Sequence, residues 1–492
     1  MRIEPLLLGL CAPLVAVLVS LTARRPRICE AANLIAALIV FACAIPLPFL
    51  IQGRTLHFWR DYVILDPLAA WVLVCTAIVY LLASIYSIGY MRLLREDDRL
   101  FEYYALFAGF AFTILGGPLM NNIGIYWIAI ELTTLVSTFL VAFEREAESM
   151  EAAWKYIMVV SAGISLALLG TILFYWAGTF VLGPSYEMTW AALGGAAARM
   201  NPTLLILSFL LVLVGYGTKV GLAPMHSWLP DAHSESPAPV SAMLSGALLN
   251  TAMLGIVRFL RILHVGGLGP LPQVVLVAFG VLSLLVGALF IVRQSGVKRL
   301  MAYSSIEHMG VLALGFGFGG VLGVAGALYH MLNHALNKSL MFFGAGSVMR
   351  AYDTKDMDAI RGVPRRFPLI GGLWLAGAVA ITGAPPFGLF MSEFTVMRAG
   401  LSGRFAWAVI AMGILLIVIF IGFLNHFRAM FWGVHHTEPE PEPQRPQVAL
   451  GAWFVAPMIL ALAPLLLFGL WWPQPVWTYL ASIGQTLWGA TP

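Results

Sequence analysis

The amino-acid sequence predicts an all-α polytopic membrane protein with about fourteen transmembrane helices. Hydrophobic residues make up 60% of the 492 residues, and charged residues make up only 11%. The mean hydropathy is +0.88. A soluble chain of this length would need far more polar surface to cover its exterior, whereas a bilayer removes that need. The composition therefore excludes an ordinary soluble protein.

Apolar runs long enough to cross a bilayer recur along the whole chain. We predict spans at about residues 3–22, 32–51, 67–88, 103–120, 122–142, 156–177, 203–221, 238–262, 273–292, 301–319, 321–347, 368–399, 405–427 and 449–472. Because this number is even, both termini should lie on the same side of the membrane.

The positions of Lys and Arg predict which side that is. Of the 28 Lys and Arg residues, 18 fall in loops on one side of the predicted spans and 8 fall on the other. Lys219 and Lys338 belong to neither set, because they lie at membrane depth. The side richer in Lys and Arg is normally cytoplasmic, so both termini are predicted on the non-cytoplasmic side. TEPEPEPQRPQ (437–447) is then an extended cytoplasmic linker before the last span.

The cysteines predict packing and not redox chemistry. Cys11, Cys29, Cys43 and Cys75 form no CxxC pair and lie away from the histidine-rich regions. We therefore expect no iron–sulfur cluster, structural zinc or disulfide framework. No Gly-rich nucleotide loop follows a strand, so no nucleotide is expected to bind. We also expect no cofactor and no nucleic-acid partner.

Two ionisable residues in the first half are candidates for function, because a charge inside a bilayer costs several kcal/mol. Glu131 lies near the middle of NIGIYWIAIELTTLVSTFLVAF, and Lys219 follows a long apolar run in LLILSFLLVLVGYGTKVGLAP. Pro224 breaks the helix directly after Lys219, and broken spans are tolerated where they line a polar cavity. The alternatives are a hydrogen-bonding glutamate of structural importance and a lysine that snorkels to the interface.

The second half carries a similar set. His330, His334 and Lys338 are spaced by four residues, so they share one helix face, as a hydrated proton relay requires. Paired histidines also suit zinc, but that helix offers no carboxylate or cysteine to complete a metal site, so no metal is expected.

A second broken span, interrupted at GAPP (383–386), carries Glu393. Two broken spans in corresponding halves indicate a transporter built from repeats, with Glu393 standing where Lys219 stands in the first half. His226 and His233 beside the first break, and Glu307 and His308 in AYSSIEHMG, are supporting relay candidates. Their alternative is local hydrogen bonding at a helix start.

These motifs resemble a known family. KVGLAPMHSWLPDAHSESPAPVSAMLSGALLNTAMLGIVRF, AYSSIEHMG, HMLNHALNKSL and GAPPFGLFMSEF occur in the order found in the antiporter-like subunits of respiratory complex I, membrane-bound hydrogenases and multisubunit cation/proton antiporters. The details look most like the F component of hydrogenase-4 and formate hydrogenlyase-type complexes.

The resemblance implies two inverted five-helix repeats, each with a broken helix. It divides the chain into N-terminal helices 1–3 (1–102), a first repeat of helices 4–8 (103–265), a second repeat of helices 9–13 (266–430), and the linker with the last helix (431–492).

The resemblance also implies roles for individual residues. Glu131 is the acid paired with the broken-helix lysine, Lys219 is that lysine, Lys338 is the central lysine, and Glu393 is the terminal site of the second half-channel. Many members have a further lysine where this chain has Asn250, which can relay a proton through water but cannot hold one.

We therefore expect a proton-translocating membrane subunit in the cell inner (cytoplasmic) membrane. It would have no redox site of its own and would be driven by a peripheral, [NiFe]-hydrogenase-like redox module through other membrane subunits. The alternatives are a subunit of a cation/proton antiporter and the membrane partner of an inorganic-carbon uptake system. Lys and His along the axis compete with a metal cation, so H⁺ is favoured over Na⁺ as the transported ion.

Overall fold

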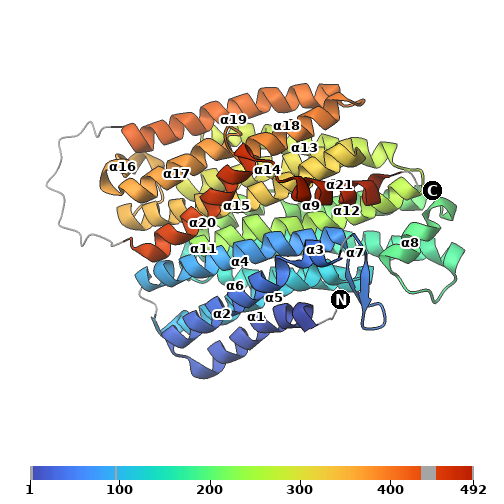
Figure 1. The fold of residues 1–492 in the computed structure, drawn as a ribbon, viewed down its shortest axis with the longest axis horizontal. Helices are drawn as coiled ribbons and strands as arrows, with labels where there is room; N and C mark the ends of the chain where they lie inside the picture. The colour runs from blue at the N-terminus through green and yellow to red at the C-terminus, as the bar shows by residue number, and fades with distance from the viewer. Residues whose placement is uncertain (1–3, 52, 95–96, 434–449, 490–492) are drawn as a thin grey trace.

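The protein is a bundle of long helices that run along one direction, as the computed structural model shows (Figure 1). The structure describes residues 4–51, 53–94, 97–433 and 450–489. The predicted Pro/Glu linker at 437–447 lies outside the described residues.

The helices of the first half are α1 (Glu4–Ala23), α2 (Pro26–Ala44), α3 (Leu47–Ile51), α4 (Pro67–Leu93), η1 (Asp97–Arg99), α5 (Leu100–Gly116), η2 (Gly117–Leu119), α6 (Ile123–Val141), α7 (Ala147–Leu182), α8 (Trp190–Ala196), η3 (Ala197–Arg199), α9 (Pro202–Val220), α10 (Trp228–Glu235), α11 (Ala238–Met243), the π-helical turn η4 (Leu244–Leu248) and α12 (Leu249–Val265). Those of the second half are α13 (Pro270–Ile291), α14 (Val297–Phe318), α15 (Gly320–Tyr352), η5 (Met357–Ala359), α16 (Val363–Arg366), α17 (Pro368–Ile381), α18 (Gly388–Leu401), α19 (Ala406–Trp432), α20 (Ala452–Leu470) and α21 (Gln474–Trp488).

Within the described ranges, 11 helices are long and apolar enough to cross a membrane. The remaining predicted spans coincide with α14, α15 and the pair α17–α18. The buried His, Lys and Glu side chains of α14 and α15 make these helices more polar than their neighbours. The helical membrane class is thus confirmed, while the number fourteen stays a prediction.

One short sheet interrupts the otherwise helical fold. Strands β1 (Leu56–Phe58) and β2 (Val63–Leu65) pair in an antiparallel hairpin between α3 and α4. The turn residues Trp59, Arg60 and Asp61 all have positive φ angles. The alternation of apolar residues here is too short to predict a strand from the sequence.

Both predicted helix breaks are present. α9 ends where Gly221 adopts φ +79°, and the chain continues without helix until Trp228 starts α10. The freed backbone groups find partners inside the protein: Trp228 Nε1 donates to the Thr218 carbonyl at 2.7 Å, and Ala223 N donates to Ser283 Oγ at 2.9 Å. In the second break, Gly383 at φ +66° and two prolines separate α17 from α18. Such backbone is tolerated at membrane depth only when it is enclosed by protein in this way.

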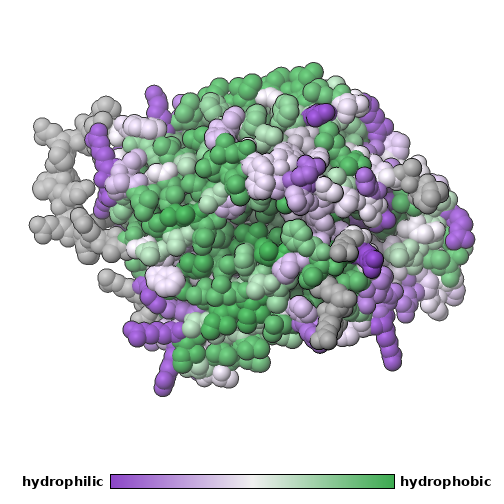
Figure 2. All heavy atoms as spheres, in the orientation of Figure 1, coloured by the Kyte–Doolittle hydropathy of each residue, from purple (hydrophilic) through white to green (hydrophobic). Residues whose placement is uncertain are grey.

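The centre of the bundle is α15. It packs against α14, α17, α18, α20 and α4, and almost all of its residues are buried. Apolar side chains cover the middle of the face shown in Figure 2, while hydrophilic side chains gather toward the two ends of the long axis. The polar residues of α14 and α15 are therefore enclosed by an apolar exterior, as a membrane-spanning channel or transporter requires.

Candidate functional site

Lys219 lies in the last turn of α9, immediately before the first break, and is fully buried. Its Nζ donates to Thr134 Oγ1 of α6 and to the Tyr156 hydroxyl of α7, each at 2.8 Å. The amine also lies 5.0 Å from the centre of the Tyr156 ring. Tyr156 in turn contacts Ser137 Oγ at 2.7 Å. Two hydroxyl groups therefore hold the lysine, and each can accept a proton from an ammonium or donate one to a neutral amine.

Glu131 lies one turn before Thr134 on α6 and is partly exposed. Its Oε1 accepts a hydrogen bond from Ser161 Oγ at 2.7 Å, and its Oε2 accepts one from Thr134 Oγ1 at 3.4 Å. No described carboxylate forms an ion pair with Lys219. The link from Glu131 to Lys219 thus runs through the Thr134 hydroxyl, because Thr134 shares the face of α6 that points to α9.

Lys338 has an equivalent environment in the second half. It is fully buried on α15, and its Nζ donates to Ser304 Oγ and, at 3.2 Å, to the Met301 carbonyl, both on α14. In the part of the chain that the structure describes, Lys338 also lacks an ion pair with a carboxylate. The two lysines at membrane depth therefore share one arrangement, in which neutral oxygen atoms surround a buried amine.

A chain of histidines continues from Lys338. His330 and His334 lie on the same buried face of α15, as predicted, and their rings are 5.1 and 5.4 Å from the ring of His308 on α14. His308 Nδ1 lies 3.2 Å from His330 Nε2. Both carboxylate oxygens of Glu307 are buried without a described hydrogen-bond partner. Glu307 and His308 lie in the middle of α14, so the alternative of hydrogen bonding at a helix start is wrong.

Glu393 completes this group from α18. It is 5% exposed, and one of its carboxylate oxygens lies within 4.8 Å of ring nitrogens of both His308 and His330. The histidine helix α15 itself carries no carboxylate, and the carboxylate that meets the histidines comes from α18. Glu393 follows the second break, whereas Lys219 precedes the first, so the two residues do not stand in equivalent places.

Glycines of the second break make room for these polar groups. A Cβ at Gly383 would collide with Glu393 Oε2, and one at Gly388 would collide with Asn333 Oδ1. The break therefore does more than end a helix, since it allows the backbone to approach the buried carboxylate closely.

The predicted supporting histidines of the first break differ from one another. His226 lies partly exposed in the break itself. His233 is fully buried on α10 and stacks on Phe342 of α15, with ring centres 5.2 Å apart. Since Phe342 lies one turn beyond Lys338, His233 faces the second-half axis rather than Lys219.

A polar cavity of about 230 Å³ opens at the end of the bundle formed by the loops after α6 and α15. It is lined by Glu144, Glu235, Lys298, Arg350 and Lys355. Although partial burial lowers the pKa of Lys355, its hydrogen bond with Glu235 raises that pKa overall. Lys298 Nζ donates to the Ser236 carbonyl, and the Ser236 hydroxyl contacts Ser241 Oγ at 2.9 Å. These groups lead from the cavity toward His233.

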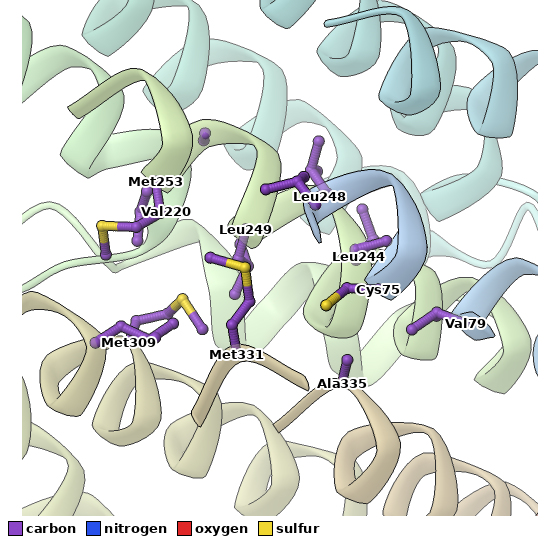
Figure 3. Packing of buried hydrophobic residues seen from close by; sticks show 14 of the residues in the cluster. Cys75, Val79, Val220, Leu244, Leu248, Leu249, Met253, Met309, Met331 and Ala335 are labelled. Atoms are coloured by element: carbon purple, nitrogen blue, oxygen red, sulfur yellow. The ribbon is translucent and has the colours of Figure 1, made fainter. Parts of the chain in front are cut away.

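An apolar layer lies where α9 and α12 face α14 and α15, the helices that carry His308, His330 and His334 (Figure 3). It is formed by Val220, Leu249, Met253, Met309 and Met331, all of which are at most 1% exposed (Figure 3). Asn250 follows Leu249 in the chain, just after the π-helical turn η4. Its Nδ2 donates to the Gly246 carbonyl of its own helix at 2.8 Å, and its Oδ1 is buried without a described partner.

Sequence reasoning missed the residues whose hydroxyl groups contact the predicted site residues. Thr134, Tyr156, Ser304 and Ser392 all contact a predicted site residue. Ser and Thr are common in membrane helices because they can hydrogen-bond to their own backbone, so they carry little signal. Sequence spacing could have identified two of them, because Thr134 lies three residues after Glu131 and Ser392 directly precedes Glu393.

The family described as "NADH:quinone oxidoreductase/Mrp antiporter, TM" matches residues 120–420, which contain all the residues described above. A hydrogenase-4 component F homolog of Methylacidiphilum infernorum is 42% identical over 302 residues, which cover 60% of this chain and 63% of the relative. NADH-quinone oxidoreductase subunit N of Desulforudis audaxviator is 30% identical over 366 residues, covering 72% of this chain and 69% of the relative.

The fold is also similar to that of a solved membrane complex subunit. A chain of the membrane-bound sulfane sulfur reductase, an archaeal respiratory membrane complex, superposes with a TM-score of 0.86 at 23% identity, covering 98% of this chain and 97% of that one. The chain matches less than two thirds of the length of the Methylacidiphilum relative. The family match spans more than half of the chain and includes both breaks and both buried lysines, so this protein is a member of the NADH:quinone oxidoreductase/Mrp antiporter transmembrane family.

Proposed function

We propose that this chain is a proton-translocating membrane subunit of a complex I-like or group 4 membrane-bound hydrogenase-type complex. Protons would pass through Glu131, Lys219, Lys338 and Glu393. The observation that carries the proposal is the pair of buried lysines held by hydroxyl groups. A direct ion pair would fix the charge of each amine, whereas a hydroxyl partner serves both the charged and the neutral form.

The arrangement supports a direction of transfer. The polar cavity beside Lys298 supplies an uptake route toward His233 and Lys338, and the series His334, His308, His330 leads on to Glu393. Glu393 is a carboxylate that changes charge on taking up a proton, and a cavity of about 270 Å³ between α18 and α19 reaches it. In this proposal, Glu131 controls Lys219 through Thr134.

The chain would work as one of several membrane subunits. Relatives are named as components of hydrogenase-4 and of NADH-quinone oxidoreductase, which supports a peripheral redox module, [NiFe]-hydrogenase-like in kind, as the source of energy. The loop-rich end with most Lys and Arg would face the cytoplasm of a cell inner membrane.

The test is proton uptake by sealed vesicles that contain the whole complex. Lys219→Met should leave assembly intact and abolish redox-driven proton uptake, and Glu131→Gln should lower it. Lys155→Met is the control, because Lys155 is 50% exposed and its surface ion pairs contribute little. Normal uptake by Lys219→Met would contradict the proposal. Uptake that requires a Na⁺ gradient and no electron donor would favour a cation/proton antiporter.

A further inference from the structure

The cluster of His308, His330 and Glu393 has the ligand set of a transition-metal site. The three residues come from α14, α15 and α18, and all are at most 5% exposed. One ring nitrogen of each histidine and one carboxylate oxygen lie within 4.8 Å of one another. We propose that this cluster binds Zn²⁺ or a similar borderline divalent cation through both histidines and Glu393.

The nitrogen positions already suit a shared metal ion. His308 Nδ1 and His330 Nε2 are 3.2 Å apart. Two nitrogens bound to one tetrahedral zinc ion at about 2.0–2.1 Å are separated by roughly 3.4 Å. The distance between the nitrogens is thus close to that of a shared ion, and a rotation of the two rings that aims both lone pairs at one point would admit the ion.

The second nitrogen of His330 is held as metal-binding histidines require. Ser392 Oγ lies 2.8 Å from the Leu389 carbonyl and 2.9 Å from His330 Nδ1, so a hydroxyl that donates to the carbonyl accepts from His330 Nδ1. This bond directs the lone pair of a neutral His330 to Nε2, which points at His308. A hydrogen-bonded distal nitrogen is the usual support of a ligating histidine.

The remaining groups also fit. Glu393 Oε1 and His308 Nε2 are buried without a described hydrogen-bond partner. His308 can move its proton from Nδ1 to Nε2, freeing Nδ1 for the metal, and an ionised Glu393 supplies the third ligand. Glu393 also lines a largely apolar cavity of about 270 Å³ between α18 and α19, which leaves space beside the carboxylate. Two imidazoles and one carboxylate favour Zn²⁺ and Co²⁺ over Mg²⁺ and Ca²⁺, which prefer oxygen ligands throughout.

Metal binding would have a consequence that rests on the proposed function. The ion would take the lone pairs with which His308 and His330 exchange a proton and would hold Glu393 ionised. Zn²⁺ would then inhibit proton uptake through the second half of the chain, while the binding itself requires no transport.

The binding test uses the purified full-length chain with His435→Ala and His436→Ala in every sample, because that adjacent pair is itself a metal-binding sequence. After dialysis against Zn²⁺, metal analysis should give one ion per chain, and Co²⁺ should give the visible absorption of a four-coordinate site. His330→Gln and Glu393→Gln should lose both signals. His426→Gln should keep them, since His426 hydrogen-bonds to the Ile291 carbonyl and is not a member of the cluster.

A milder variant covers the case in which His330→Gln fails to fold. Ser392→Ala keeps all three ligands and removes only the support of His330, so Zn²⁺ affinity should fall by about 10- to 100-fold. Absence of stoichiometric Zn²⁺ in the parent protein, or unchanged binding by His330→Gln and Glu393→Gln, overturns the inference.

The transport assay separates this inference from the proposed function. In vesicles of the whole complex, the concentration of Zn²⁺ for half-inhibition should rise by the same factor in Ser392→Ala, with each variant normalised to its own activity. Zn²⁺ binding without inhibition would keep the metal site and contradict the proton path. No Zn²⁺ binding together with an inactive Lys219→Met would keep the path and contradict the site.

Discussion

At the scale of single residues, the distinctive feature is how the buried amines are solvated. Lys219 donates hydrogen bonds to Thr134 and Tyr156, and Lys338 donates to Ser304 and a backbone carbonyl. Hydroxyl groups replace the water that an amine would have outside the membrane. Each hydroxyl therefore lowers the free-energy cost of charging its lysine, and removing one should change proton transfer without changing the shape of the site.

Thr134→Val tests this directly. It removes the hydroxyl that joins Lys219 to Glu131 and keeps the side-chain volume. A buried donor left without its partner costs about 1–3 kcal/mol, so proton uptake should fall by roughly tenfold or more. Thr133→Val is the matched control, because the Thr133 hydroxyl bonds to the Ile130 carbonyl of its own helix. Equal rates for the two variants, measured in the same vesicles, would show that Glu131 does not act through Thr134.

For Asn250 we expect a substitution to have only a small effect on proton uptake. Its amide bonds to its own helix and its Oδ1 contacts no described donor. Asn250→Ala should therefore reduce proton uptake only slightly, whereas Lys338→Ala and Glu393→Gln should each reduce it severely, because both remove a group that changes charge. A harmless Glu393→Gln would mean that the second half acts as a scaffold.

At the scale of elements, the two helix breaks shape the site. The second break brings the backbone that follows α17 close to the buried Glu393 carboxylate of α18, and Gly383 leaves space for it. Gly383→Ala should be damaging for two reasons. The left-handed conformation at φ +66° disfavours any Cβ by about 1–2 kcal/mol, and this Cβ collides with the Glu393 carboxylate.

The expected result is a lower thermal unfolding temperature of the purified protein and weaker proton uptake by the complex. Gly372→Ala on α17 is the control, since its Cβ would meet nothing within 4 Å and a helical Gly→Ala change stabilises by about 0.5–1 kcal/mol. If Gly383→Ala unfolds at the same temperature as Gly372→Ala, the close approach at the break does not matter.

The elements also show what a sequence can and cannot reveal. Long apolar runs, Pro224 and the GAPP segment predict the spans and both breaks, because each is a local property of the chain. The meeting of His308, His330 and Glu393 depends on the packing of three helices, which no local pattern encodes. For the same reason the sequence places Glu393 in a broken helix but not beside the histidines, and it does not reveal that Thr134 lies between Glu131 and Lys219.

At the scale of the whole molecule, the distribution of charge predicts orientation. α1 begins and α21 ends toward the same end of the bundle (Figure 1), as an even number of spans requires. A reporter fused after Pro492 should be active outside the cytoplasm, and one inserted within 437–447 should be active inside, because the loops richest in Lys and Arg remain on the cytoplasmic side. The reverse pattern of reporter activity would contradict the predicted topology.

The apolar layer of Val220, Leu249, Met253, Met309 and Met331 has an electrical consequence. The helices on both sides of it run side by side along the direction in which the chain crosses the bilayer (Figure 1). In the proposed path, a proton that passes from Lys219 to Lys338 would cross the layer from helix to helix, within the plane of the membrane. The transmembrane voltage, about 2.3 kcal/mol per charge for each 100 mV, does no work on such a step. In the proposed path, voltage would act instead on proton uptake from one face and release to the other, and the lateral transfer would depend on the dielectric of the protein.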